Sequence, residues 1–225
     1  MKPSGIRCSV IYPAVSITRF DRRDPLQSRG RGGSIRLHGG RTPQLRPAPA
    51  ERRAGTETVS ERVDLDPEFE SRLIASDILH EMCRHALDVA PEECCGLVMG
   101  NAEFPMSRVV RVTNVMTKMH VADPQTFPRD ARHAYYMAEV EYLRAIEEAD
   151  DRDEKVAAIY HSHFGQGCYL SRDDLAFASH PLFPFPEADQ IVVSVLSDRV
   201  EEVGVFELAE GLPGGYRGRR LEAAS

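Results

Sequence analysis

The sequence of 225 residues has no tryptophan, only five cysteines and no long apolar run. Without a stretch of about 18 apolar residues, nothing in it predicts a transmembrane helix. An odd and modest number of cysteines does not form the framework of a small disulfide-rich secreted protein, so we expect a reducing, cytoplasmic compartment. The net charge of −7 argues against nucleic-acid binding by the main body of the chain.

Basic residues are concentrated at the N-terminus. Residues 1–62 hold 13 Lys and Arg against 5 Asp and Glu, whereas residues 63–225 hold 15 against 30. The basic part is also rich in Gly, Pro and Ser and lacks apolar periodicity after about residue 20. We predict a disordered extension over residues 1–62, because such a segment buries too little apolar surface to offset its chain entropy. Two explanations remain open for this segment: contact with RNA, DNA or an acidic partner, and a solvated extension that is translated from a start codon placed too far upstream.

The rest of the chain alternates between helical and strand patterns. Apolar residues at helical spacing predict helices over residues 67–90, 138–149 and 172–178. Short apolar or alternating runs predict strands over residues 95–99, 108–115, 156–162, 190–196 and 200–208. For the second helix, the expected inner face consists of Val140, Leu143, Ala145 and Ile146.

These elements predict one α/β (α+β) domain over residues 66–210, with a mixed, largely antiparallel sheet flanked by helices. Residues 120–133 contain two prolines and are expected to form a loop. Residues 211–225 are rich in Gly and Arg at their start, and we expect a flexible C-terminal tail there.

One segment carries the candidate chemistry. His161 and His163 are two residues apart at the end of an apolar run. On a strand, two such imidazoles point to the same face and can share a metal ion. Asp174, in the first turn of the next predicted helix, can supply a third ligand and leave the fourth position of a tetrahedral zinc site for water. Zinc lowers the pKa of that water to about 7, which makes a nucleophile at neutral pH.

Hydrolysis at such a site also needs a proton acceptor and a donor to the developing oxyanion. Ser171, three residues before Asp174, is the candidate donor. Glu93 is the candidate general base because it enters an apolar strand, where a carboxylate is costly without a partner.

Each of these residues also has an ordinary structural interpretation. Ser171 and Asp174 have the spacing of a helix capping box, and the two histidines alone fit a hydrogen-bonded pair at a strand end. The complete pattern H-x-H-x7-S-x2-D, however, is expected by chance in roughly one in a thousand chains of this composition. Cys168, inside the same segment, fits either a packed thiol or a group that competes for zinc.

This pattern resembles the JAMM motif of the MPN (Mov34/PAD-1, JAB) metalloprotease family. The core motif is matched by His161, His163, Ser171 and Asp174, and the E-x-x-G step of the family is matched by Glu93 and Gly96. The resemblance covers roughly residues 70–208 and implies a cytidine-deaminase-like MPN fold with one zinc ion per chain. It further implies that the two histidines and the aspartate bind zinc, that the glutamate is the general base and that the serine is the oxyanion donor.

The compact form, with P-E-E-C-C-G at residues 91–96, resembles the prokaryotic branch of the family. Members of that branch are associated with small ubiquitin-like sulfur carriers, so the resemblance implies a metallopeptidase or isopeptidase acting at the C-terminus of such a protein. Phe164 and Leu170 stand where many relatives have proline, which affects substrate preference more than chemistry. A non-catalytic MPN scaffold and a zinc amidohydrolase acting on a small aminoacyl conjugate are the alternatives, and homo-oligomerisation is left open.

Overall fold

The computed structural model describes residues 62–181 and 183–224. The extension that the sequence predicts to be disordered therefore lies outside the described residues, except for Arg62. The helices are α1 (Ser76–Val89), α2 (Met116–Ala122), α3 (Glu139–Asp150), α4 (Arg172–Ala178) and the 3-10 turn Pro213–Gly215. The strands are β1 (Arg62–Asp64), β2 (Arg72–Ile74), β3 (Cys95–Gly100), β4 (Arg108–Val112), β5 (Lys155–Phe164), β6 (Tyr169–Ser171), β7 (Asp189–Leu196), β8 (Arg199–Leu208) and β9 (Tyr216–Ala223).

The main sheet has seven strands in the order β2-β9-β8-β7-β5-β3-β4, and β1 and β6 form a separate antiparallel pair. Only β5 with β7 and β2 with β9 are parallel within the main sheet. The prediction of a mixed, largely antiparallel sheet is thus confirmed. Parallel neighbours need a crossover connection, and the segment between β5 and β7 supplies it with β6 and α4.

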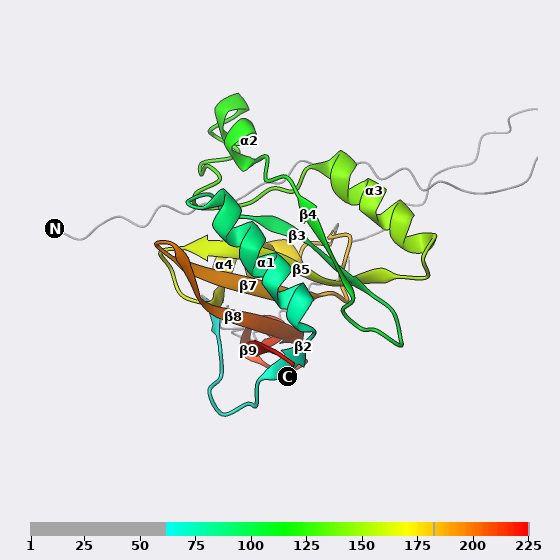
Figure 1. Ribbon diagram of the computed structural model, residues 1–225. Helices are drawn as coiled ribbons and strands as arrows, with labels where there is room; N and C mark the ends of the chain where they lie inside the picture. The colour runs from blue at the N-terminus through cyan, green and yellow to red at the C-terminus, as the bar shows by residue number, and fades with distance from the viewer. Residues whose placement is uncertain (1–61, 182, 225) are drawn as a thin grey trace, which may run out of the picture. The chain divides into compact units, whose positions relative to one another are not determined.

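Helices cover both faces of this sheet. On one face, α1 packs Ile78, Met82 and Ala86 against Val98 and Tyr160 (Figure 1). On the other face, α3 packs Ala145 and Ala149 against Leu97 and Met99, the two β3 residues that flank Val98. Because successive strand residues point to opposite faces, β3 contributes to both cores and is buried along its whole length. In the described part of the chain, no helix is both long and apolar enough to cross a lipid bilayer.

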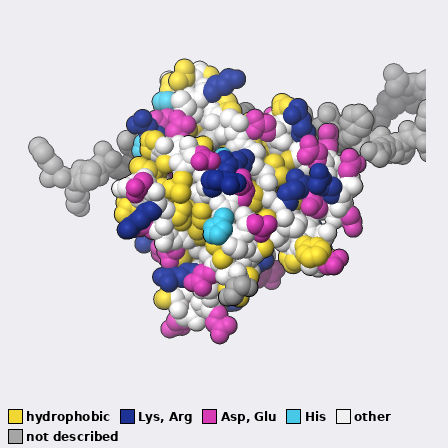
Figure 2. All heavy atoms as spheres, viewed as in Figure 1, with side chains coloured by type: hydrophobic (Ala, Val, Ile, Leu, Met, Phe, Trp, Pro, Cys, Tyr) yellow, Lys and Arg dark blue, Asp and Glu magenta, His cyan; other side chains and the backbone are white. Residues whose placement is uncertain are grey.

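The outer side of α1 carries charges of both signs next to one another. Arg111 of β4 donates to Glu81 at 2.7 Å and to Asp88 at 2.8 Å, and Arg84 pairs with the same Glu81. Figure 2 shows this face, where basic and acidic side chains lie interspersed around apolar ones. Exposed pairs of this kind add little stability, so the two apolar layers hold the helices on the sheet.

The first helix is shorter than the sequence predicts. Residues 67–90 were expected to be helical, but α1 begins at Ser76, and residues 72–74 form the edge strand β2. The predicted loop over residues 120–133 also begins later, because His120 lies in the last turn of α2. Both boundaries are set by tertiary pairing and packing, which local periodicity does not report.

The predicted inner face of α3 is partly wrong. Val140 is 70% exposed and Leu143 is 46% exposed, whereas Ala145 and Ala149 are buried. The two alanines are four residues apart and lie on one side of the helix. Their small side chains allow α3 to approach the sheet closely, and this contact outweighs the burial of the larger residues.

The prediction of a flexible tail over residues 211–225 is also wrong. Residues 216–223 form β9, which pairs with β8 on one side and with β2 on the other. Its apolar residues Tyr216 and Leu221 are buried. The arginines that made this segment resemble a tail form ion pairs with β8, from Arg219 to Glu207 and from Arg220 to Glu202, each at 2.8 Å. The folded domain therefore extends past the predicted boundary at residue 210.

A buried polar contact connects α1 to the centre of the sheet. His85 Nδ1 and the Tyr160 hydroxyl form a hydrogen bond of 2.7 Å. Burial, together with the nearby Arg111 guanidinium and against the opposing charge of Asp88, lowers the pKa of His85 to about 4. His85 is therefore neutral in the folded protein at physiological pH.

We predict that Leu221→Ala destabilises the protein by about 2–4 kcal/mol, because it removes a buried side chain that packs against the α1 core. Leu208→Ala is the matched control, since Leu208 is 51% exposed on the neighbouring strand and should cost under about 1 kcal/mol. Chemical denaturation measures both. Equal losses for the two variants would show that β9 does not contribute to the core.

We also predict that stability falls between about pH 6.5 and pH 4. The folded pKa of His85, about 4, lies below its unfolded value of 6.5, so the unfolded chain binds the additional proton. The contribution of neutral His85 is complete above pH 6.5 and decreases by about 1 kcal/mol per pH unit below it. Denaturation across this range should show a shallower slope for His85→Gln, while His80→Gln, on the same helix, should keep the wild-type slope.

Candidate metal centre

The two motif histidines lie near the C-terminal end of β5. This strand is paired with β3 on one side and β7 on the other, opposite Cys95 and Val192 at His161 and opposite Ser194 at His163. Their spacing of two residues places both imidazoles on the same face, as the sequence predicts. Both side chains are buried, and strand pairing on both sides fixes the backbone that carries them.

Asp174 reaches the same point from the first turn of α4. Ser171 caps this helix: the Asp174 backbone N–H donates to Ser171 Oγ at 3.2 Å, and the Ser171 N–H donates to Asp174 Oδ2 at 2.8 Å. The Ser171 hydroxyl donates to the same Oδ2 at 2.6 Å. The capping box that the spacing also allowed is therefore present, and it orients the carboxylate toward the histidines.

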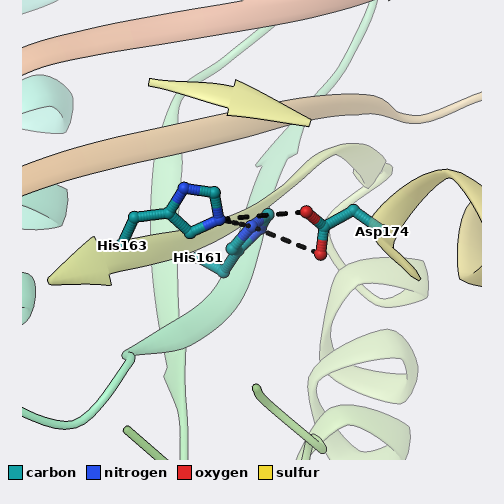
Figure 3. Close-up of side chains that lie close together, drawn as sticks. All are labelled: His161, His163 and Asp174. Atoms are coloured by element: carbon teal, nitrogen blue, oxygen red, sulfur yellow. Dashed lines mark hydrogen bonds and ion pairs between the residues drawn. The ribbon is translucent and has the colours of Figure 1, made fainter. Parts of the chain in front are cut away.

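The three side chains converge closely enough to hold one ion. The Nε2 atoms of His161 and His163 are 3.2 Å apart, and the Asp174 oxygens lie 3.6 Å and 3.8 Å from them (Figure 3). A tetrahedral zinc ion with bonds of about 2.0–2.1 Å separates its ligand atoms by roughly 3.3 Å. The spacing and the donor set of two nitrogens and one carboxylate oxygen therefore fit zinc.

Hydrogen bonding also suits His163 to a ligand role. Its Nδ1 lies 3.0 Å from the Gly167 carbonyl oxygen, which can only accept, so Nδ1 carries a proton and Nε2 is the atom that faces His161 and Asp174. His161 Nδ1 is buried without a hydrogen-bond partner among the described residues. The His161 ring is instead held by stacking on Tyr135, with ring centroids 4.7 Å apart.

The charges of the three groups are strongly coupled. Burial opposes ionisation of Asp174, but the charge of His161 and hydrogen bonds from both histidines outweigh it and lower the pKa of the carboxyl well below 3.8. Burial also disfavours the charged form of His163, yet the hydrogen bond and charge of Asp174 raise its pKa. Asp174 thus presents a negative charge to any cation that lies between the histidines.

Glu93 lines the same cleft, just before β3. Its backbone is fixed on both sides, since its N–H donates to Ala131 O at 2.7 Å and its carbonyl accepts from Asn114 Nδ2 at 2.8 Å. The residue is 5% exposed, and burial raises the pKa of its carboxyl to about 8, against the charges of His163 and Arg129, which lower it, while Asp174 raises it. A pKa near neutrality suits a group that accepts and returns a proton.

Gly96 explains the glycine of the E-x-x-G step. It lies opposite Tyr160 in the pairing of β3 with β5. A Cβ at this position would lie 2.4 Å from Val110 O and 2.5 Å from the Tyr160 ring. Only glycine therefore allows the tyrosine to pack here, one residue before His161.

The cleft has a volume of about 350 Å³ and brings together Glu93, His163, Ser171 and Asp174, with His161 against His163. The sequence did not indicate several further residues that line it, because they lie in loops or beside the motif without a pattern of their own. These are Arg129, Tyr135, Tyr169, Asp173 and Phe177.

Cys168 does not face the candidate ligands. Its thiol is buried beside Gly204 and donates to Val192 O at 3.3 Å. Burial raises the pKa of the thiol to about 12, so it holds its proton at neutral pH. This favours the packed thiol over the competing zinc ligand.

Known proteins are similar to this chain in sequence. Residues 75–206 match the family described as prokaryotic homologs of the JAB domain. Curated relatives named CysO-cysteine peptidase, from Mycobacterium bovis and Mycobacterium tuberculosis, are 26% identical over 141 residues, which is 62% of this chain and 84% of theirs.

Solved structures with a similar chain path have low sequence identity. A protein from Desulfitobacterium hafniense is 17% identical, with a TM-score of 0.48, over 67% of this chain and 91% of its own. A JAB1/MPN domain protein from Archaeoglobus fulgidus is 15% identical, with a TM-score of 0.39, over 69% of this chain and 100% of its own.

We predict that His163→Ala and Asp174→Asn each weaken zinc binding by at least tenfold, because each removes one of three ligands. His133→Ala is the matched control, since this exposed histidine lies at the same cleft but bonds to Asp130. Titration of metal-free protein with zinc against a competing chelator measures the affinities. Wild-type affinity in both ligand variants would exclude this set of ligands.

Proposed function

The chain belongs to the family of prokaryotic JAB-domain homologues, and we propose that it is a zinc-dependent metallopeptidase or isopeptidase. Its proposed substrate is a peptide or isopeptide bond at the C-terminus of a ubiquitin-like or sulfur-carrier protein. The observation that carries the proposal is the convergence of His161, His163 and Asp174 in a cleft that also holds Glu93. The relatives named CysO-cysteine peptidase support a carrier protein as the substrate class.

His161, His163 and Asp174 would hold the ion. A zinc ion bound there supplies Lewis-acid chemistry, which polarises a carbonyl and acidifies water. Tyr135 stacks on His161, and Tyr169 lies against His163 with ring centroids 5.0 Å apart. These rings hold the imidazoles in place and reduce the access of bulk water to them.

Glu93 is the proposed general base. It takes a proton from the attacking water and returns it to the leaving amine. The hydrogen bonds of its backbone to Ala131 and Asn114 position the side chain, and its raised pKa allows both steps near neutral pH.

Ser171 has two proposed roles. In the structure its hydroxyl donates to Asp174 and orients that carboxylate. To stabilise the oxyanion of the tetrahedral intermediate, the same hydroxyl must turn away from Asp174 during the reaction.

We predict that the zinc-loaded protein cleaves a sulfur-carrier protein extended by one C-terminal residue and that a chelator abolishes the cleavage. Glu93→Gln should lower the rate by about 10²–10⁴-fold while zinc content is kept, because it removes the proton acceptor but no ligand. Glu92→Gln is the matched control, since Glu92 directly precedes Glu93 and its side chain is exposed. Mass spectrometry of the carrier measures cleavage.

Two results would overturn this assignment. A zinc-loaded protein that cleaves no carrier conjugate but hydrolyses small aminoacyl conjugates is the amidohydrolase alternative. A protein that folds fully and cleaves neither class is the non-catalytic scaffold. A Glu93→Gln variant with the wild-type rate would remove Glu93 from the mechanism.

A further inference from the structure

Arg129 is a cation in the cleft that the proposed hydrolysis does not use. It lies in the connection between α2 and α3 and lines the same cavity as Glu93 and Asp174. Of the residues described as lining that cavity, it alone is an arginine or lysine, whereas Glu93, Asp173 and Asp174 are acidic.

The loop that carries Arg129 is anchored on both sides of this residue. Phe127 and Ala131 are buried together with Met116 of α2, and the Ala131 N–H donates to Thr117 Oγ1 at 3.1 Å. The Ala131 carbonyl accepts the backbone N–H of Glu93 at 2.7 Å. The position of Arg129 is therefore coupled to that of the proposed base.

A second link ties the later part of the loop to the same point. Asn114 Nδ2 donates both to Glu93 O, at 2.8 Å, and to Ala134 O, at 3.1 Å. One amide side chain thus holds the glutamate and the loop together. Such a double anchor preorganises the loop for binding before a substrate arrives.

Two contacts orient the Arg129 guanidinium but do not engage all of its N–H donors. Arg129 forms an ion pair with Asp173, and its Nη1 donates to His133 O at 3.2 Å. A guanidinium has five N–H donors. The contacts with the described residues use only some of them, so several N–H groups can still bind a ligand. The side chain is 41% exposed, and its planar donor set matches a carboxylate.

A substrate of the proposed peptidase carries a carboxylate that can reach Arg129, namely the α-carboxylate of its C-terminal residue. A peptidase that removes one C-terminal residue cuts the last peptide bond of its substrate. The α-carboxylate of the leaving residue is then separated from the scissile carbonyl by that one residue, and consecutive Cα atoms are only about 3.8 Å apart. Only a cation close to the catalytic groups can bind it. Arg129 meets this condition, because it lines the same cavity as Glu93, His163 and Asp174.

We propose that Arg129 binds the α-carboxylate of the leaving residue, so that the site removes a single amino acid from a conjugate that ends in a free carboxylate. This inference rests on the proposed function and narrows its substrate class. An internal peptide bond places no carboxylate at this position, and an isopeptide bond to a lysine side chain places it farther away. Arg129 would therefore determine specificity without entering the bond-breaking step.

The test compares two substrates that differ in one group. A sulfur-carrier protein carrying one C-terminal cysteine is prepared with a free carboxylate and with a carboxamide. Wild-type zinc-loaded protein should cleave the acid with a kcat/KM about 10–100-fold higher than the amide, since a hydrogen-bonded charge pair is lost with the amide. The difference should appear mainly in KM.

Variants on the same loop complete the experiment. Arg129→Ala should lower kcat/KM for the acid about 10–100-fold more than for the amide, and Arg129→Lys should restore part of the preference. Arg132→Ala is the control, because Arg132 is exposed and is not among the residues that line the cleft. Zinc content and thermal unfolding of each variant verify that the site is intact.

The outcomes separate this inference from the function on which it rests. Equal cleavage of acid and amide by the wild type, or an equal loss on both substrates in Arg129→Ala, overturns the carboxylate site but keeps the peptidase. In the second case Arg129 acts on the oxyanion or on the fold. No cleavage of either substrate by the wild type overturns the proposed function itself.

Discussion

The centre of this molecule depends on one carboxylate that serves two structures. Asp174 completes the capping box of α4 and, through the same group, faces the two imidazoles of β5. The helix cannot shift along its axis without moving the third candidate ligand, and this carboxylate cannot turn without losing its contacts with Ser171. The crossover between the parallel strands β5 and β7 thus has a fixed end close to the histidines. The capping of α4 and the proposed metal binding therefore require the same position of the Asp174 carboxylate.

The sequence predicted most of the central fold because its signals there are local. Strand periodicity located β3, β5, β7 and β8 to within a residue or two, and the spacing of two placed His161 and His163 on one face. The motif likewise indicated Asp174 and Ser171, whose spacing is fixed by one helical turn. What failed was non-local. β9 is a strand because its backbone pairs with β8 and β2 and because its Tyr216 and Leu221 are buried, and a composition count cannot show such partners.

The same limit applies within the site. Glu93 was identified from its entry into an apolar strand and from its match to the E-x-x-G step, but its nearness to the histidines depends on the pairing of β3 with β5, where Cys95 lies opposite His161. Arg129 carried no signal at all, because its loop is placed by Ala131 and Asn114 contacts that join segments more than 15 residues apart. The motif therefore specifies the proposed chemistry, whereas the long-range hydrogen bonds determine what can approach it.

The short pair of β1 and β6 has a consequence for the N-terminal part of the chain. Arg62 lies opposite Ser171 in this ladder, and its guanidinium lies over the Tyr169 ring at 5.0 Å from the centroid. Tyr169 is itself part of the cleft wall. Arg62 is thus the strand partner of Ser171, whose hydroxyl bonds the candidate ligand Asp174. A chain that lacks Arg62 would lose one pair of the β1–β6 ladder and a contact with the cleft wall.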